Sequence, residues 1–441
     1  MLENYCATAS DDNLETTCDV IVLGAGISGL VSASILAEQG YERILVLDEY
    51  AHIGGNHIDC RIGNYTFDIG SFIFQDDSPL LHHFPELLPL YTPIKPTFAR
   101  LNPQGFVTRY PISIKDDILS TGPIEISRIL LSLIISRLSR RKLTNARNFA
   151  QYWIGARLLK KSGLENYIER FHGVPAEQID LGFAEKRMGW IKEHASLSSI
   201  RKWLKPSASP PTNQQLVRPK EGFDQLYQVA ANKLKTRGVT FHLGVELKSL
   251  RRLGETFQVQ VGDRYFSSGR VVSTIPLERV QDLCAIPRET RLQTVTLMSL
   301  FFSFSGNRGF TESVLYNFSY AGAWKRLTMH SDFYGRSEGR EFFNVEINAD
   351  HVAASVRTAE EDFRRHTFTN GLFVGDLKLE GYHILSNAYP IYSDNSAERA
   401  SKAIFALKEF GIESFGRQGG FNYQPTARVS TIEAEAALRR N

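Results

Sequence analysis

Residues 19–56 read DVIVLGAGISGLVSASILAEQGYERILVLDEYAHIGGN, and this stretch decides the fold. An apolar run of strand length leads directly into Gly24, Gly26 and Gly29. Residues 30–39 then show the apolar spacing of a helix. The first glycine permits a tight turn, the second lets the backbone approach a pyrophosphate, and the third lets the helix pack on the strand. The stretch therefore predicts a strand, turn and helix that bind a dinucleotide.

The residues around this turn complete the expected cofactor site. Ile27 and Ser28 lie in the glycine turn and are expected to contact the cofactor, and the N-terminus of the following helix offers unpaired N–H groups and a partial positive charge to its phosphates. A second strand, 44–47, ends at Asp48 and Glu49. The Asp48 carboxylate can accept hydrogen bonds from ribose hydroxyls, and it would repel a 2′-phosphate. We therefore expect an adenosine without that phosphate, in contact with both acidic residues.

A second glycine pair, Gly54 and Gly55, follows where an NAD-binding domain normally passes to its next helix. Paired glycines suit a backbone that lies close to a bulky, extended cofactor. The block resembles the two-glycine flavoproteins, which are amine oxidases, carotenoid desaturases, protoporphyrinogen oxidases and UDP-galactopyranose mutases. With Asn56, His57 and Asp59 after the pair, it looks most like the mutases. The resemblance implies non-covalently bound FAD, contacted by the pair and by Asn56 and His57. An NAD-binding domain with an incidental glycine pair is the alternative.

The resemblance extends over nearly the whole chain and implies its fold class. That class is α/β, with a Rossmann-like FAD-binding domain, a helical insertion and a mixed β-sheet substrate domain. The expected division is a flexible arm at 1–17, an FAD-binding domain in three parts (18–100, 213–285 and 386–441), a helical cap at 101–205 and a substrate sheet at 286–385.

The end of the chain carries a second motif. Residues 415–423, FGRQGGFNY, resemble the closing motif of the mutases. The resemblance implies that Gly416 and Arg417 bring backbone and charge to the flavin pyrophosphate or ribityl. A similar glycine-rich stretch, 371–376, is a rival, but no helix follows it directly. The further residues expected against the cofactor are Val245 at the adenine end, and Phe421, Asn422 and Tyr423 after the closing glycine.

The catalytic residues implied by the resemblance are less complete. Tyr389 and Tyr423 match tyrosines that hold the substrate diphosphate, and Arg326 resembles an arginine of the substrate sheet, expected between about 295 and 347. Trp190 faces the flavin or substrate, or else belongs to the core, and Lys192 stands near an expected arginine. The family histidine is replaced by Phe72, and two family arginines are missing from their expected places. Possible substitutes are Arg326, Lys192, Arg109 and Lys325.

Three functions remain open at this stage. The first is a mutase-like enzyme that acts on a nucleotide sugar or related glycosyl substrate through reduced flavin, with NAD(P)H as a possible external reductant. The second is a redox flavoenzyme, an oxidase, dehydrogenase or desaturase, whose apolar floor would be supplied by Phe301, Phe302 and Phe304. The third is a flavin-binding protein whose catalytic set has decayed.

Composition narrows the class of protein. The 441 residues are 42% hydrophobic and 22% charged, as in ordinary globular enzymes, and the net charge of +3 is too small to indicate nucleic-acid binding. The N-terminus lacks the basic and apolar regions of a signal peptide. Four scattered cysteines without metal-ligand spacing are expected to be reduced, so no metal site is expected. We expect a cytoplasmic flavoprotein with a small-molecule substrate.

One segment could contact a membrane. Residues 123–143, PIEISRILLSLIISRLSRRKL, are strongly apolar and end in basic residues, but their uninterrupted apolar part is too short to span a bilayer. A helix buried in the cap domain, with a solvated basic end, is the preferred interpretation. An amphipathic helix on an anionic membrane surface is the alternative.

Overall fold

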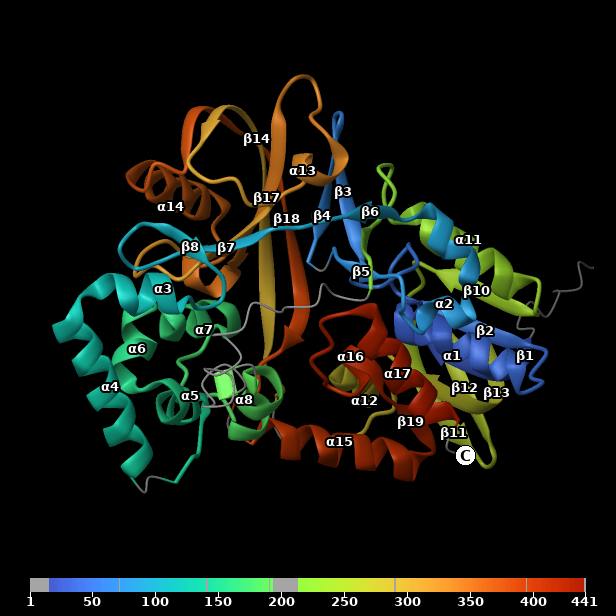
Figure 1. Cartoon of the computed structure of the whole chain (residues 1–441). Helices are drawn as coiled ribbons and strands as arrows, with labels where there is room; N and C mark the ends of the chain where they lie inside the picture. Colours follow the sequence, from blue (N-terminus) through green and yellow to red (C-terminus); the bar gives the residue numbers. More distant parts are fainter. Residues whose placement is uncertain are drawn as a thin grey trace, which may run out of the picture. The chain divides into compact units, whose positions relative to one another are not determined.

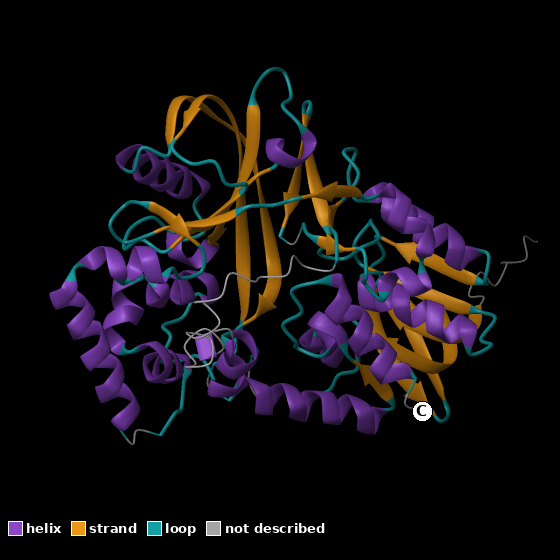
Figure 2. Cartoon of the chain, in the orientation of Figure 1, coloured by secondary structure: helices purple, strands orange, loops and turns teal. Residues whose placement is uncertain are grey.

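The computed structural model describes residues 16–70, 72–139, 142–189, 191–192, 213–288, 291–393 and 395–439. The chain forms two compact units. The first is built from Met1–Gly55, Tyr227–Arg291 and Ala400–Asn441, and the second from Asn56–Leu226 and Leu292–Arg399. Figure 1 shows the elements along the chain, and Figure 2 shows that both units combine helices with sheets.

The first unit contains a largely parallel sheet, as the sequence predicts. Its strand order is β10-β2-β1-β13-β12-β11, and β19 pairs with β13. Residues 20–23 of β1 and residues 44–47 of β2 are all buried and apolar, which is typical of parallel strands covered on both faces. The strands are β1 (Thr16–Leu23), β2 (Ile44–Asp48), β10 (Val239–Leu243), β11 (Leu247–Leu253), β12 (Thr256–Val261), β13 (Arg264–Ser273) and β19 (Ile412–Ser414).

Helix α1 follows β1 directly and packs against the last helix of the chain, α17. Ten of its twelve residues are buried, so α1 is a core helix of this unit. Two further helices cross from one unit to the other along the sequence, α11 and α15. The bounds are α1 (Ile27–Glu38), α11 (Asp224–Lys235), α12 (Leu277–Leu283), α15 (Ser396–Phe410), α16 (Gly416–Gly419) and α17 (Ala427–Leu438).

The second unit is organised by a mixed sheet of order β18-β14-β17-β16-β15-β7-β8. Alternate residues of β17 point to opposite faces. Phe343 and Val345 join a core that includes Phe363 of α14 (Val356–Thr369), whereas Asn344 and Glu346 lie on the other face. The strands are β7 (Phe98–Leu101), β8 (Val107–Arg109), β14 (Thr294–Arg308), β15 (Val314–Asn317), β16 (Trp324–Met329), β17 (Glu341–Asn348) and β18 (Phe373–Pro390).

Smaller elements complete the second unit. The short strands are β3 (Ile58–Ile62), β4 (Tyr65–Ile69), β5 (Phe74–Gln75), β6 (Thr92–Ile94) and β9 (Gln215–Val217). The helices are α2 (Leu80–His83), α3 (Ile114–Asp117), α4 (Pro123–Leu138), α5 (Ala146–Ile154), α6 (Ala156–Lys161), α7 (Leu164–His172), α8 (Leu181–Arg187) and α13 (Ser331–Tyr334). The 3₁₀ turns are η1 (Pro85–Leu90), η2 (Leu119–Thr121) and η3 (Ala349–Val352).

Helix α4 differs from the preferred interpretation of its sequence. We expected a buried helix, and this was wrong, because Ile129 is its only buried residue.

No single helix among the described residues is long and apolar enough to cross a membrane, although the bent pair Lys115–Thr121 and Pro123–Leu138 passes the same test of length and composition.

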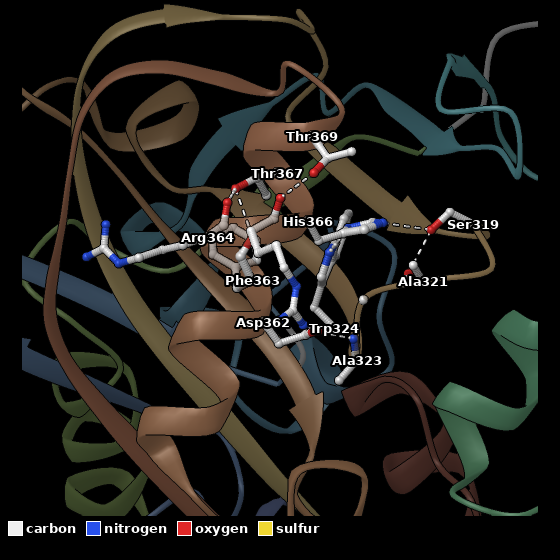
Figure 3. A network of polar contacts seen from close by, with 12 residues as sticks. Ser319, Ala321, Ala323, Trp324, Asp362, Phe363, Arg364, His366, Thr367 and Thr369 are labelled. Atoms are coloured by element: carbon white, nitrogen blue, oxygen red, sulfur yellow. Dashed lines mark hydrogen bonds and ion pairs between the residues drawn. The ribbon is translucent and has the colours of Figure 1, made fainter.

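The loop between β15 and β16 is held by a buried polar network, and Figure 3 shows the part of it that Asp362 and His366 form. Arg170 of α7 donates hydrogen bonds to the carbonyl oxygens of Ser319 (2.7 Å), Ala321 (3.0 Å) and Gly322 (2.7 Å). Asp362 of α14 accepts a hydrogen bond from the Ala323 N–H at 2.7 Å. A guanidinium and a carboxylate thus fix the backbone that leads into β16.

His366 of α14 completes this network. The Trp324 Nε1–H group donates to His366 Nδ1 at 2.9 Å, so the ring proton lies on Nε2, which faces Ser319 Oγ at 3.0 Å. Burial lowers the pKa of His366 to about 4, and Asp362 opposes this shift only in part. The histidine is therefore neutral at physiological pH, as its two hydrogen bonds require.

We expect His366 to make the second unit sensitive to acid. Its folded-state pKa of about 4 lies below the ordinary value of 6.5, so its contribution to stability is complete above pH 6.5. That contribution is lost as the pH falls from 6.5 to 4, and about 2 kcal/mol should be lost by pH 5. Urea unfolding at pH 7 and pH 5 measures this loss of unfolding free energy in wild type and in His366→Asn. His82→Asn, at an exposed histidine, is the control. An equal pH dependence in wild type and His366→Asn would contradict this role.

Candidate functional site

The glycine turn of the first unit has the close contacts that its sequence predicts. Gly24 has φ +105°, and a Cβ there would lie 2.4 Å from Thr274 Oγ1. A Cβ on Gly29 would lie 1.9 Å from the Gly24 carbonyl oxygen, so helix α1 touches the turn itself. Helix α1 starts with Ile27 and Ser28, both buried, and no side chain caps its N-terminus. Its first N–H groups can therefore bind a phosphate.

The second glycine pair lies beside the first turn. The Gly54 N–H donates to the Ala25 carbonyl oxygen at 2.9 Å, and Gly26 and Gly54 form a β-bridge. A Cβ on Gly26 would lie 3.6 Å from the Gly55 Cα. Gly54 itself has φ +108° and packs against the Tyr227 ring, which a Cβ would approach to 2.4 Å. Two backbone segments without side chains thus meet at one place, as an extended cofactor requires.

The structure gives Asp48 a role in holding the turn. Its Oδ2 accepts a hydrogen bond from the Ala25 N–H at 2.6 Å, and its Oδ1 accepts one from the Tyr50 N–H at 2.8 Å. Burial raises the pKa of Asp48, and these two bonds oppose the shift. The Val245 N–H bonds to the Asp48 carbonyl oxygen at 3.1 Å, and Glu49 pairs at the surface with Arg279. Asp48, Glu49 and Val245 are therefore neighbours at the end of β2.

The closing motif also reaches the glycine turn. Gly416 has φ +87°, and a Cβ there would lie 2.8 Å from Ser28 Oγ at the start of α1. The Gly416 N–H and the Asn422 side-chain amide both donate to Glu433 of α17, at 3.2 and 2.8 Å. Buried Phe421 has φ +49°, and Arg417 accepts through its carbonyl oxygen from the Asn422 N–H. Sequence reasoning missed Glu433, which binds this loop from the middle of helix α17.

The rival glycine-rich stretch at 371–376 has a different place. It enters β18 in the second unit, where Gly375 is paired with Gly306 of β14. A Cβ on Gly375 would lie 2.3 Å from the Ser305 carbonyl oxygen, so this glycine serves the close pairing of two strands.

The groups gathered in the first unit fit the pyrophosphate of a dinucleotide. The start of α1 offers N–H groups, and Gly26 and Gly55 leave room for close approach. Ser273 Oγ, at the end of β13, is buried and has no hydrogen-bond partner among the described residues. Asn56 and His57, which follow the glycine pair, begin the second unit, and His57 packs there against the Phe223 ring.

A second candidate site lies on the polar face of the sheet in the second unit. The strand register aligns five residues in one row across five strands, with Glu346 at the centre. The face opposite this row carries the apolar core that contains Phe302 and Phe304. The row comprises Tyr316, Arg326, Glu346, Ser299 and His383.

Glu346 binds two cations at the centre of this row. Its Oε1 forms an ion pair with Arg326 Nη2, and its Oε2 lies 3.4 Å from Lys325 Nζ. The side chains of Glu346 and Lys325 are each only 3% exposed. Burial raises the pKa of Glu346, but Arg326 and Lys325 outweigh it and hold the pKa below the ordinary value. The carboxylate is therefore ionised, and the three side chains carry a net charge of +1.

Two predicted catalytic residues meet through Lys325. Its Nζ donates to Tyr389 Oη at 2.8 Å, and Tyr389 Oη donates to the Phe171 carbonyl oxygen at 2.6 Å. Arg326 Nη2 also donates to the Gly70 carbonyl oxygen, and its guanidinium lies over the Phe72 ring at 5.5 Å. Arg326 and Tyr389 thus belong to one buried cluster, and Phe72 borders it.

Other predicted catalytic residues lie elsewhere. The Lys192 ammonium lies over the Trp153 ring of α5 at 5.7 Å, and Lys192 is exposed. Tyr423 belongs to the first unit, and Trp190 lies outside the described residues. Sequence reasoning also missed Glu346. Its signal was the alternation in residues 341–348, EFFNVEIN, which places Glu346 on the same face as Asn344.

Two glycines of the turn allow cofactor binding to be separated from folding. Gly26→Ala adds a Cβ without a clash and should cost less than about 1 kcal/mol, yet it fills the space for a pyrophosphate. Gly29→Ala places a Cβ against the Gly24 carbonyl and should destabilise the fold itself. We expect Gly26→Ala to lose dinucleotide, measured by absorbance after acid release, and to unfold at nearly the same temperature as wild-type protein stripped of its cofactor. Full dinucleotide content in folded Gly26→Ala would contradict this site.

Removing the charge of Glu346 should destabilise the second unit. Glu346→Gln leaves Lys325 and Arg326 buried without their carboxylate, a change that typically costs about 3–5 kcal/mol. Ser299→Ala is the matched control, because Ser299 Oγ lies in the same row, is buried and has no hydrogen-bond partner among the described residues. Urea unfolding should show a large loss for Glu346→Gln and almost none for Ser299→Ala. Equal stability of the two variants would show that the ion pairs do not hold this face.

Comparisons with known proteins agree with this architecture. A family model described as an NAD(P)-binding Rossmann-like domain matches residues 22–86. A prolycopene isomerase of an Oncidium hybrid cultivar is 46% identical over 65 residues, which are 14% of this chain and 11% of the isomerase. A probable UDP-galactopyranose mutase of Klebsiella pneumoniae is 34% identical over 103 residues, which are 22% of this chain and 25% of the mutase. The chain thus spans a quarter or less of these relatives.

Solved structures resemble almost the whole chain. A reduced UDP-galactopyranose mutase has a TM-score of 0.75 at 16% identity, with 96% of this chain and 95% of the mutase covered. A putative protoporphyrinogen oxidase from Exiguobacterium sp. 255-15 has a TM-score of 0.72 at 14% identity, with 96% and 98% covered. These likenesses show the fold. The chain therefore has the fold of the two-glycine flavoproteins, and part of it is similar in sequence to a UDP-galactopyranose mutase and a prolycopene isomerase.

Proposed function

We propose that this protein is an FAD-dependent enzyme related to the UDP-galactopyranose mutases, and that it acts on a nucleotide sugar or a related glycosyl diphosphate. The glycine turn, the second glycine pair and the closing motif would hold the cofactor. They are brought together around α1 by contacts that involve Gly26, Gly54 and Gly416. When bound and reduced, the flavin supplies a nucleophile for the sugar carbon that carries the diphosphate, as the resemblance to the mutases implies.

The observation that carries the proposal is the positive cluster on the polar face of the sheet. A diphosphate leaving group needs charge-assisted donors. The two positive charges of Lys325 and Arg326 exceed the single negative charge of Glu346 by one. Arg326 donates both of its hydrogen bonds to protein acceptors from Nη2. The Arg326 side chain is 19% exposed, against 3% for Lys325 and Glu346, so Arg326 is the member of the cluster that a ligand reaches most easily. The role of Arg326 is to bind and orient that leaving group, and Tyr389 holds the Lys325 ammonium in place beside it.

The redox alternative has less support in the structure. It rested on Phe72 and on three phenylalanines as the floor of an apolar substrate cavity. Phe72 is buried and lies under the Arg326 guanidinium. Phe302 and Phe304 instead belong to the core on the opposite face of the sheet, where Phe302 packs against Phe363 of α14. Phe301 is covered by Phe67, with ring centroids 4.7 Å apart. These phenylalanines therefore do not provide an open apolar floor.

The test is the absorption spectrum of the purified protein with nucleotide sugars, before and after reduction with dithionite or NAD(P)H. We expect a flavin spectrum that UDP-sugars perturb, and sugar isomerisation by the reduced protein alone. Arg326→Gln should weaken UDP-sugar binding about tenfold or more, because a charged hydrogen bond contributes roughly 1.5–3 kcal/mol. The exposed Arg109→Gln should leave binding unchanged.

Three results would contradict the proposal in different ways. A bound flavin that responds to no nucleotide sugar but bleaches with an amine or alcohol would favour the redox alternative. Absence of flavin after reconstitution with FAD would contradict the assignment of the cofactor itself. Equal UDP-sugar binding by Arg326→Gln and wild type would show that the cluster is not part of the substrate site.

A further inference from the structure

Helix α4 presents an apolar face to solvent. Six large side chains of this sixteen-residue helix are between 52% and 76% exposed, and Leu138 is the most exposed of them. At 100° per residue they fall within an arc of about 140° on one side of the helix. Helix α4 lies at the outer edge of the helices of the second unit (Figure 1). The six side chains are Ile124, Leu130, Leu131, Ile134, Ile135 and Leu138.

The inner side of α4 is held firmly. Ile129 is buried, and Ser132 Oγ accepts a hydrogen bond from the Arg157 N–H of α6 at 3.1 Å. A Cβ on Gly155 would lie 3.0 Å from the Leu133 Cα, so the backbones of the α5–α6 turn and α4 nearly touch. The inner contacts therefore fix the rotation of α4, and its apolar side faces outward as part of the folded structure.

Cations border this apolar face. Leu131 and Ile135 also line a pocket of about 890 Å³ between α4, α5 and α6. Its charged lining residues are four cations and one carboxylate, which gives an excess of three positive charges, and exposed Lys142 follows the end of α4. The charged lining residues are Arg128, Arg157, Lys160, Lys161 and Glu125.

An apolar helix face bordered by cations matches an anionic lipid surface. Helices that lie in the membrane interface bury an apolar face at the boundary of head groups and acyl chains, and their basic residues attract anionic lipids. A second copy of this chain is a poorer partner, because it would bring an equally cationic border against the first.

We propose that α4 and the adjoining cationic pocket form a docking surface for an anionic phospholipid membrane. The apolar face enters the interface, and Arg128, Lys160 and Lys161 contact lipid phosphates. The protein is then peripheral, held at the surface by one helix and its basic border. This inference is independent of the proposed function, since it uses none of the residues placed at the cofactor or substrate sites.

The experiment is co-sedimentation of the full chain with vesicles of phosphatidylcholine alone or mixed with phosphatidylglycerol. We expect pelleting with the mixed vesicles, little with phosphatidylcholine, and release at high salt. The triple variant Leu131→Gln/Ile135→Gln/Leu138→Gln should bind at least about tenfold more weakly. Its circular dichroism and thermal unfolding should match wild type, because these side chains are exposed.

Matched controls distinguish binding through this surface from nonspecific hydrophobic binding to vesicles. Phe368→Gln/Val374→Gln/Tyr382→Gln removes three exposed apolar side chains elsewhere in the second unit and should not alter vesicle binding. Lys160→Gln/Lys161→Gln should weaken binding to mixed vesicles only. The proposal is overturned if wild type pellets with neither vesicle, if it pellets equally with both, or if the α4 triple variant pellets like wild type. It is also overturned if sedimentation velocity shows that α4 instead mediates self-association.

Discussion

Contact between backbones that carry no side chain is the constraint on which the first unit depends. The helix that follows β1 touches its own turn at Gly29, the second glycine pair lies against Gly26, and the closing segment reaches Ser28 through Gly416. These contacts join three segments that are far apart in the sequence. A Cβ on Gly29 or Gly416 would push one segment away and disturb the first turn of α1, whose N–H groups are arranged to receive a phosphate.

Such local constraints explain why the first unit was predictable from its sequence. The spacing of Gly24, Gly26 and Gly29 after an apolar run requires one turn geometry, whatever the rest of the chain does. The polar cluster of the second unit was not predictable in the same way. Glu346 lies twenty residues from Arg326, and their pairing depends on the register of β16 and β17, which includes an irregularity between Trp324 and Arg326. Period-two alternation places Glu346 on a face but does not choose its partner.

Helix α4 shows a further limit of sequence patterns. Its apolar run is compatible with burial in a core and with exposure at a membrane interface, because both environments select the same side chains. The contacts of α4 with the neighbouring helices distinguish these two environments. Close contacts at Gly155 and Ser132 hold α5 and α6 against one side of α4. These helices cover only a narrow strip of α4, in which Ile129 is buried. The six exposed large apolar side chains on one helix are the basis of the interaction surface that we propose for α4.

The buried carboxylate of Glu346 does more than neutralise charge. Glu346 and the Gly70 carbonyl oxygen both bind Arg326 at one nitrogen, Nη2. The Phe72 ring lies against the guanidinium from one side. The orientation of the cation is thus determined before any ligand arrives, which lowers the entropy lost on binding. Lys325 is oriented in the same way by Glu346 and Tyr389. The surplus of one positive charge then remains for an anionic ligand, and an arrangement with no carboxylate would leave two buried cations that repel each other.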